Sequence, residues 1–319
     1  MSARLTTPPK HGHESLLYSQ VVEDLDTLQA DIAVLGIPYG SAYSIADVSN
    51  DQSNAPTAVR QASDRAVRAL ERYDFDIGGP LLMNKDIRMV DCGDVIADAR
   101  DLGASYRNAE AAVRKILKAG ALPLIIGGDH GIPIPVLRAY DDQEGPITLI
   151  QIDAHIDWRD EFNGVRDGLS SPIRRISELP YVGDIFQIGI RAQGSARQED
   201  LDAALAYGAN IVTAYELHDV GMDAVLERIP DGGRYYLTID ADGMDPSVMP
   251  AVAGPALGGV TYAQAGKLIH GLANKGRVVG MDIVEITPAK DVNRISAIAA
   301  CRLFVNMIGA TIKAGYFDR

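Results

Sequence analysis

Three short segments of the sequence concentrate aspartate and histidine side chains at close spacing. The side chains concerned are His130, Asp153, His155, Asp157, Asp240 and Asp242. In an extended chain, residues two apart point to the same side, so each segment directs its polar groups toward one place. Several buried charges would repel one another without compensation, and divalent cations supply it. Mixed histidine and carboxylate ligands favour Mn, Fe, Co, Ni or Zn over Mg or Ca, which prefer all-oxygen shells.

Six such ligands can hold two cations when some of the carboxylates bridge them. A metal pair lowers the pKa of a shared water, so hydroxide is available near neutral pH as a nucleophile for a planar, electrophilic carbon. No cysteine lies near these segments, which argues against a structural zinc site. For Asp129 and Asp245 we favour the ordinary role of a lone aspartate, in a turn or a cap. The remaining histidines lack comparable acidic neighbours, and we predict that they are not ligands: His11, His13, His218 and His270.

The polar clusters follow apolar runs that have the character of buried strands. These runs are rich in Ile, Val and Leu and do not alternate with polar residues, as in strands covered on both faces. They span residues 32–37, 89–90, 122–126, 147–152, 185–190, 235–239 and 278–286. Helix-periodic segments lie between them, at residues 56–73, 106–119, 197–207, 262–275 and 296–314. The alternation predicts a mainly parallel sheet with helices on both faces and a ligand site beyond the carboxyl ends of the strands.

The composition fits one large domain of an ordinary globular protein. The chain has 319 residues, of which 47% are hydrophobic and 23% charged, and we assign residues 21–319 to one domain after a polar extension over residues 1–20. A net charge of -13 argues against nucleic-acid binding and suits a cationic substrate. The two cysteines are far apart and in apolar contexts, as expected in a reducing cytoplasm. We find no signal peptide and no bilayer-spanning stretch, so we predict a cytoplasmic protein without a membrane partner.

Taken in order, these motifs resemble those of the ureohydrolase family, which includes arginases, agmatinases and related guanidino-acid hydrolases. The resemblance extends from about residue 32 to residue 309. It rests on Gly127-Gly128-Asp129-His130, Asp153-Ala154-His155-Ile156-Asp157, Asp240-Ala241-Asp242 with Asp245-Pro246, and Gly280-Met281-Asp282-Ile283-Val284-Glu285. It implies a three-layer α/β/α sandwich around an eight-stranded, mainly parallel sheet. It also implies two divalent metal ions, Mn(II) or alternatively Ni(II), and hydrolysis of a guanidinium group to urea and an amine.

Carried over position by position, the resemblance assigns ligands to both metals. One would be held by His130, Asp153, Asp157 and Asp240, and the other by Asp153, His155, Asp240 and Asp242, so that Asp153 and Asp240 bridge. Glu285 matches the family's carboxylate that pairs with the substrate guanidinium, for which a bidentate acceptor is well suited. We therefore predict Glu285 and Asp157 as catalytic residues. A homo-trimer or hexamer is also implied.

Three loops depart from the family's pattern. The loop after the second metal segment has no histidine, and Leu169 stands near its usual place, which leaves Asp167, Ser170, water or Glu285 to move a proton to the leaving amine. The segment Ala251-Val252-Ala253-Gly254-Pro255-Ala256 lacks the usual carboxylate and hydroxyls. The loop after residue 37 has Tyr39 and a polar stretch with Asp47 and Asn50. We predict Glu285, Asp167, Ser170 and Tyr39 as substrate contacts.

The departures leave the substrate open. A small guanidine, a biguanide or a guanidino acid is at least as good a candidate as arginine or agmatine. One alternative function is a deacetylase-type amide hydrolase on a similar sheet, although such enzymes generally use one metal and paired histidines that this sequence lacks. The other is a non-catalytic subunit of a hetero-oligomer, against which the complete ligand set argues.

Overall fold

The chain is described by a computed structural model that covers residues 4–9, 14–39, 43, 51–98, 100–193 and 196–318. Its centre is one sheet whose strands run in the order β1-β4-β3-β5-β10-β9-β6-β7-β8, with β2 also paired to β4. The strands are β1 (Thr6–Thr7), β2 (Gln20–Val21), β3 (Ile32–Ile37), β4 (Met89–Val95), β5 (Leu122–Gly127), β6 (Ile147–Ile152), β7 (Val182–Ile190), β8 (Asn210–Thr213), β9 (Arg234–Asp240) and β10 (Arg277–Val284).

Every pairing among β3 to β10 is parallel, so these strands form the eight-stranded parallel sheet that the resemblance implied. Two further strands, of two residues each, raise the total to ten: β2 is parallel to β4 and β1 is antiparallel to it. Strand β1 lies in the 1–20 segment, where Leu16 and Leu17 are also buried in the core, and β2 begins at the last residue of that segment. The boundary at residue 20 stays a prediction, but the described parts of this segment pack against the sheet.

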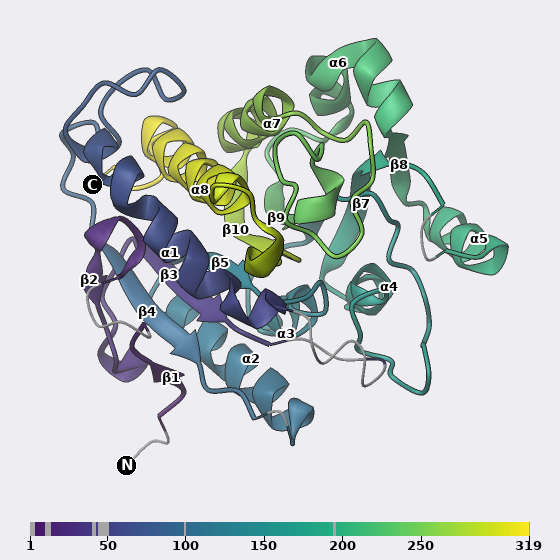
Figure 1. The fold of residues 1–319 in the computed structure, drawn as a ribbon, viewed down its shortest axis with the longest axis horizontal. Helices are drawn as coiled ribbons and strands as arrows, with labels where there is room; N and C mark the ends of the chain where they lie inside the picture. The colour runs from purple at the N-terminus through teal and green to yellow at the C-terminus, as the bar shows by residue number, and fades with distance from the viewer. Residues whose placement is uncertain are drawn as a thin grey trace.

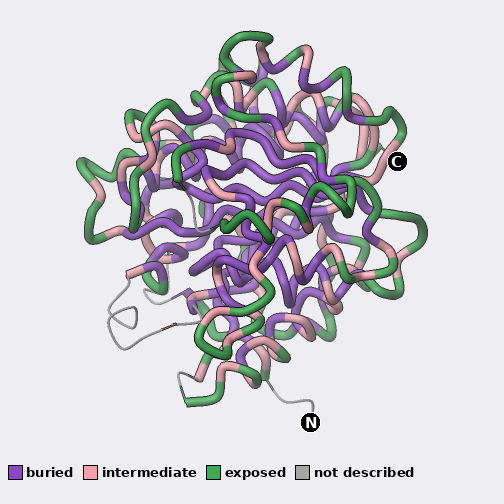
Figure 2. Tube along the Cα trace, turned by 90° about the vertical axis from the view of Figure 1, so that its right-hand side faces the viewer, coloured by how far each residue is buried: buried purple, intermediate pink, exposed green. Residues whose placement is uncertain are grey.

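Helices cover both faces of the sheet, as Figure 1 shows. On one face α1 and α7 pack against α8, and α6 packs against α7; on the other, α2 packs against α3, and α3 against α4. The bounds are α1 (Ala55–Ala66), α2 (Leu102–Lys118), α3 (Pro133–Arg138), α4 (Pro172–Ser177), α5 (Gln198–Tyr207), α6 (Ala214–Arg228), α7 (Tyr262–Lys275) and α8 (Ile295–Lys313). A separate apolar cluster fills each side, which confirms the three-layer α/β/α prediction. The buried chain runs through the middle of the molecule in Figure 2.

The predicted elements are present, and the structure adds several that the sequence pattern did not indicate. The predicted helix over residues 56–73 ends as an α-helix at Ala66 and continues as a 3-10 turn to Leu70. Helices α3 and α4 were missed because each has only six residues. Helix α6 was missed as well, and Gly221 interrupts it with a left-handed φ of 79°. The last strand, β10, ends at Val284 rather than at residue 286.

We expected no stretch long enough to span a bilayer, and one helix, α8, differs from that expectation by length and composition alone. By length and composition, α8 passes that test, with a mean hydropathy of 1.7 over the best window. However, 83% of that window is buried inside the protein, which is the environment of a core helix. Cys301, on this helix, and Cys92, on β4, are both buried free thiols.

Candidate metal centre

Three of four adjacent strands, β5, β6 and β9, position the predicted metal ligands, and the fourth, β10, positions Glu285. In the centre of the sheet, β5, β10, β9 and β6 lie side by side, and a single row in register contains Ile126, Ile283, Ile239 and Ile152. The chain leaves this row at the carboxyl ends of the four strands, where the polar segments begin. The strand order therefore brings together groups that are more than 150 residues apart in sequence, such as the His130 backbone N–H and the Glu285 carboxylate.

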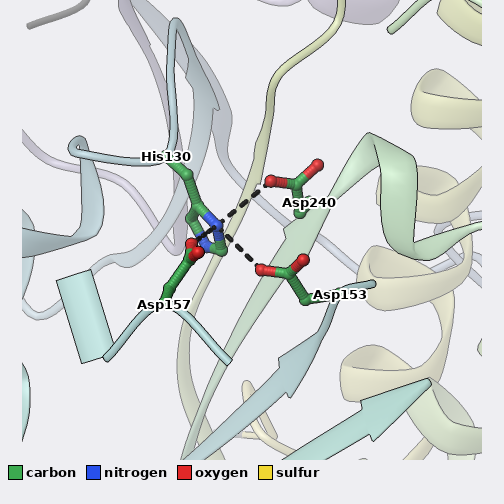
Figure 3. Close-up of side chains that lie close together, drawn as sticks. All are labelled: His130, Asp153, Asp157 and Asp240. Atoms are coloured by element: carbon green, nitrogen blue, oxygen red, sulfur yellow. Dashed lines mark ion pairs between the residues drawn. The ribbon is translucent and has the colours of Figure 1, made fainter. Parts of the chain in front are cut away.

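His130, Asp153, Asp157 and Asp240 form the first ligand group (Figure 3). The His130 Nδ1 atom lies 2.8 Å from an oxygen of Asp157, 3.0 Å from one of Asp153 and 3.1 Å from one of Asp240. All four side chains are buried, and Nδ1 makes no hydrogen bond of good geometry. A single ring N–H can serve only one of three such oxygens. This donor set therefore fits a cation at its centre better than it fits a hydrogen-bonded histidine.

Asp153, His155 and Asp242 form the second group, in which one potential ligand atom from each residue lies within 4.8 Å of the others. The His155 Nδ1 atom is 3.4 Å from oxygens of both aspartates. Asp153 belongs to both groups, in agreement with its predicted bridging place. Asp240, the other predicted bridge, belongs only to the first group, and one of its oxygens accepts a hydrogen bond from the Asp242 backbone N–H at 2.8 Å.

The convergence is as predicted, but strand alternation is not its cause. Strand β6 ends at Ile152, so Asp153, His155 and Asp157 all lie in the loop that follows. The Asp157 backbone has a left-handed φ of 47°, which is uncommon outside glycine. Asp240 is the last residue of β9, and Asp242 lies in a short 3-10 helix, Ala241–Gly243. Except for Asp240, these side chains are therefore directed inward by loop or 3-10 conformation rather than by extended strand.

Burial and mutual repulsion raise the pKa of two carboxylates in the cluster when no cation is bound. Burial and the charge of Asp153 raise the pKa of Asp157 to about 7, and burial with the charges of Asp240 and Asp153 raises that of Asp242 well above its usual range. Burial alone would lower the pKa of His155, but its hydrogen bond to Asp153 and the nearby carboxylates raise it to about 10. Protons thus occupy this cluster near neutral pH until a cation displaces them.

Glu285 lies at the edge of the same cluster. It follows β10 with a left-handed φ of 64°, and its backbone N–H donates to the Gly128 carbonyl at 2.8 Å. Its two carboxylate oxygens accept hydrogen bonds from the His130 backbone N–H at 2.9 Å and from the Gln52 amide at 2.8 Å. Burial and the charges of Asp240 and Asp129 raise the pKa of Glu285 to about 8. Gln52, which is buried, was not identified from the sequence, since it stands in a polar stretch without a recognisable motif.

A buried hydrogen-bonded chain supports His130 from behind. With Nδ1 turned to the cluster, Nε2 lies 3.2 Å from the Thr238 hydroxyl, which donates to Asp282 Oδ1 at 2.6 Å. The Tyr236 hydroxyl donates to the other Asp282 oxygen at 2.7 Å. Burial raises the pKa of Asp282 to about 6, against the hydrogen bonds from Thr238 and Tyr236 that lower it. Thr238 and Tyr236 lie two residues apart on β9 and so point to the same face of the sheet, but their roles were not predicted from the sequence.

The other predicted substrate contacts, Tyr39, Asp167 and Ser170, each have a protein partner in the structure, and their contact with substrate stays a prediction. The Tyr39 ring packs edge-on against Tyr106 with centroids 5.5 Å apart, within the apolar cluster on the α2 side. The Asp167 carboxylate pairs with Arg138 at 2.9 Å. The Ser170 hydroxyl is 2.9 Å from that of Tyr43.

None of Tyr39, Asp167 and Ser170 belongs to either ligand group among the described residues. Several positions from our predictions lie outside the described residues, namely His11, His13, Asp47 and Asn50.

The predictions for Asp129 and Asp245 agree with the local hydrogen bonds. Asp129 accepts from the Gly131 N–H at 2.9 Å, as in a turn. Asp245 accepts from the N–H groups of Gly258 and Gly259, and thereby ties two loops together. His218 and His270 lie outside both ligand groups found among the described residues.

Comparison with known proteins gives a consistent result. The sequence model of the Arginase family matches residues 30–309. An agmatinase of Salmonella paratyphi B is 30% identical over 292 residues, which are 88% of this chain and 87% of that protein. The crystal structure of a hypothetical agmatinase from Burkholderia thailandensis superposes with a TM-score of 0.81 and 28% identity, over 96% of this chain and 93% of the other. The structure of proclavaminate amidino hydrolase from Streptomyces clavuligerus superposes with a TM-score of 0.79 and 26% identity, over 98% of this chain and 100% of the other.

Proposed function

The chain belongs to the Arginase family, and on that premise we propose that it hydrolyses a guanidine-type substrate to urea and an amine with two divalent cations. The observation that carries the proposal is the pair of ligand groups that share Asp153. Two groups with one common carboxylate fit two neighbouring cations better than a single one. The agmatinases among the relatives support a guanidinium as the reacting group.

We propose that His130, Asp153, Asp157 and Asp240 hold one cation and that Asp153, His155 and Asp242 hold the other, with Asp240 as a further bridge. When bound, such a pair lowers the pKa of a shared water so that hydroxide is available near neutral pH. Mn(II) is our first candidate and Ni(II) the alternative, since histidine and carboxylate ligands discriminate weakly between them.

The chain's own residues then bind and orient the substrate. Glu285 accepts N–H bonds from the planar guanidinium cation, and Gln52 and the His130 backbone hold its carboxylate in place. Burial of Glu285 and of the first ligand group excludes bulk water and strengthens these contacts. The net reaction adds water across the central carbon, breaks one C–N bond and transfers a proton to the departing amine. Glu285 is the best placed of our proton-transfer candidates, because Asp167 is paired with Arg138 and Ser170 contacts Tyr43.

A substrate panel tests the proposal directly. Metal-free protein is reconstituted with Mn(II) and, in parallel, with Ni(II), the bound metal is counted, and urea release is measured from guanidine, alkylguanidines, biguanides, guanidino acids, agmatine and arginine. We expect urea from at least one substrate, and none from the metal-free control. If no substrate yields urea while two metals are demonstrably bound, the proposal fails. A stoichiometry of one metal with amide hydrolysis would favour the deacetylase-type alternative instead.

We also propose a cytoplasmic protein, with the buried free thiols as support, and a homo-trimer or hexamer, which the resemblance of the sequence motifs implies. Sedimentation of the metal-loaded protein tests the assembly. A protein that binds metal but becomes active only with a second, different chain would revive the hetero-oligomer alternative.

A further inference from the structure

A cavity of about 550 Å³ opens beside His155 and is separate from the contacts that hold Glu285. Its walls come from three segments: the loop after β7 at Arg191 to Gln193, the start of α6, and the loop 254–258. Because His155 belongs to the second ligand group, a substrate whose guanidinium sits over the metal groups would have its substituent beside this cavity. The polarity and charge of the cavity walls therefore determine which N-substituent of the substrate binds well.

The described walls of the cavity are predominantly apolar and carry no carboxylate. Ala192, Ala214, Pro255 and Ala256 contribute small apolar surfaces. At the rim, Tyr215 is 80% exposed and Leu257 is 82% exposed. Gln193 adds a neutral amide. An alkyl group placed here would cover apolar surface that is now in water, which favours binding.

Apart from the proposed metal ligand His155, Arg191 is the one cationic side chain of the described lining, but its donors are already used. Its Nε donates to the Leu257 carbonyl, and its Nη1 donates to the carbonyls of Gly189 and Gly243. Its Nη2 donates to the carbonyls of Asp242, Met244 and Ala256. The guanidinium thus ties the 254–258 loop to the turn after β9. It offers no free N–H to a ligand carboxylate without release of one of these bonds.

His218 is similarly engaged. One ring nitrogen lies 3.1 Å from the Gly258 carbonyl and the other lies 3.5 Å from the Gln264 amide. A ligand ammonium in this cavity would therefore lose water without gaining a carboxylate, and a ligand carboxylate would find no free cation among the described residues. Burial of an unpaired charge is costly, whereas burial of a methyl group is favourable.

We infer that this cavity binds an uncharged, apolar N-substituent, so that the preferred substrates are alkyl-substituted guanidines rather than those with an ammonium or carboxylate tail. The inference rests on the proposed function for its reaction, but it concerns binding alone. It makes the loop 254–258, which departs from the family's sequence pattern, the part of the chain that determines specificity.

A matched ligand set tests the inference by equilibrium binding. N-pentylguanidine and agmatine have nearly the same shape, but a methyl group in the first replaces the ammonium of the second, and 4-guanidinobutanoate carries a carboxylate. Calorimetry on the metal-loaded protein should give the lowest Kd for N-pentylguanidine, by on the order of 10-fold over both charged ligands. If agmatine or 4-guanidinobutanoate binds as tightly, or if none of the three binds, the inference is wrong.

A paired substitution at the rim provides a second test. Because only the backbone carbonyl of Leu257 contacts Arg191, Leu257→Asp adds a carboxylate without loss of that bond, and Leu257→Asn is the uncharged control of equal size. We expect Leu257→Asp to shift the Kd ratio toward agmatine by about fivefold, as for an exposed ion pair, and Leu257→Asn to shift it far less. Equal shifts in both variants would contradict the inference.

Urea release from the same ligands is recorded separately from binding. Tight, selective binding of N-pentylguanidine without urea from any guanidine would refute the proposed function and leave the binding assignment intact. Urea release with a preference for agmatine would support the proposed function and refute the binding assignment.

Discussion

Thr238 offers a test of the hydrogen-bonded chain behind His130. Thr238→Val keeps the shape of the side chain but removes the hydroxyl that lies between His130 Nε2 and Asp282. Both groups then lose one buried hydrogen bond, each worth about 1 kcal/mol net, or more where a charged group takes part. Since these bonds fix the orientation of the ring whose Nδ1 faces the metal cluster, we expect metal affinity to fall by about 10- to 100-fold, or roughly 1.4–2.7 kcal/mol.

The assay is a competition titration of the metal-free protein with Mn(II) against a chelator of known affinity. Thr311→Val is the matched control, because Thr311 is also fully buried, its hydroxyl bonds carbonyls of its own helix, and it belongs to neither ligand group. Both variants lose a buried hydroxyl, so a general loss of stability affects them alike. If Thr238→Val binds metal as tightly as Thr311→Val, the hydrogen-bonded chain does not support the metal centre.

Three further predictions concern Glu285 and the metal-free protein. Glu285→Gln should bind both metals but lose at least 100-fold in kcat/KM. The control Glu227→Gln, at an exposed position, should change neither the metal content nor kcat/KM. If Glu285→Gln loses metal, Glu285 is a ligand instead. Gln52→Leu removes a bond that lowers the pKa of Glu285, so the acidic limb of the pH–rate profile should move to higher pH; an unmoved profile would exclude this role. In chelator, the free energy of unfolding should fall between pH 5.5 and 8. The reason is that the raised pKa values of Asp157, about 7, and Glu285, about 8, give stability that is present below pH ~4 and lost as pH rises through those values. Denaturant melts in which the free energy of unfolding rises over this pH range would contradict the prediction for the metal-free protein.

The main features of the fold and the metal cluster could be predicted because they depend on simple regularities. Unbroken apolar runs indicate strands covered on both faces, and parallel strands bring their carboxyl ends to one edge. The positions of His130, Asp153 and Asp240 follow from that edge alone. The short helices α3 and α4 could not be predicted, since six residues give too little periodicity.

The contacts around the ligands depend on side-chain directions that the sequence does not contain. Gln52 reaches Glu285 across 233 positions, and only the packing of the 3-10 turn at Asp51–Asn54 makes that contact. Tyr39 and Asp167 were predicted to contact substrate because they lie in loops near the site. In the structure the first packs into the core and the second pairs with Arg138. A loop's position was thus predictable from its strand, whereas the direction of its side chains was not.

The central claim is that one carboxylate, Asp153, serves two cations. Metal content per chain, measured after reconstitution with Mn(II) and removal of free metal, tests this most directly. We predict two ions in the unmodified protein, about one in Asp157→Asn and in Asp242→Asn, and none in Asp153→Asn, with urea release lost in the last. Two retained ions and full turnover in Asp153→Asn would contradict the account.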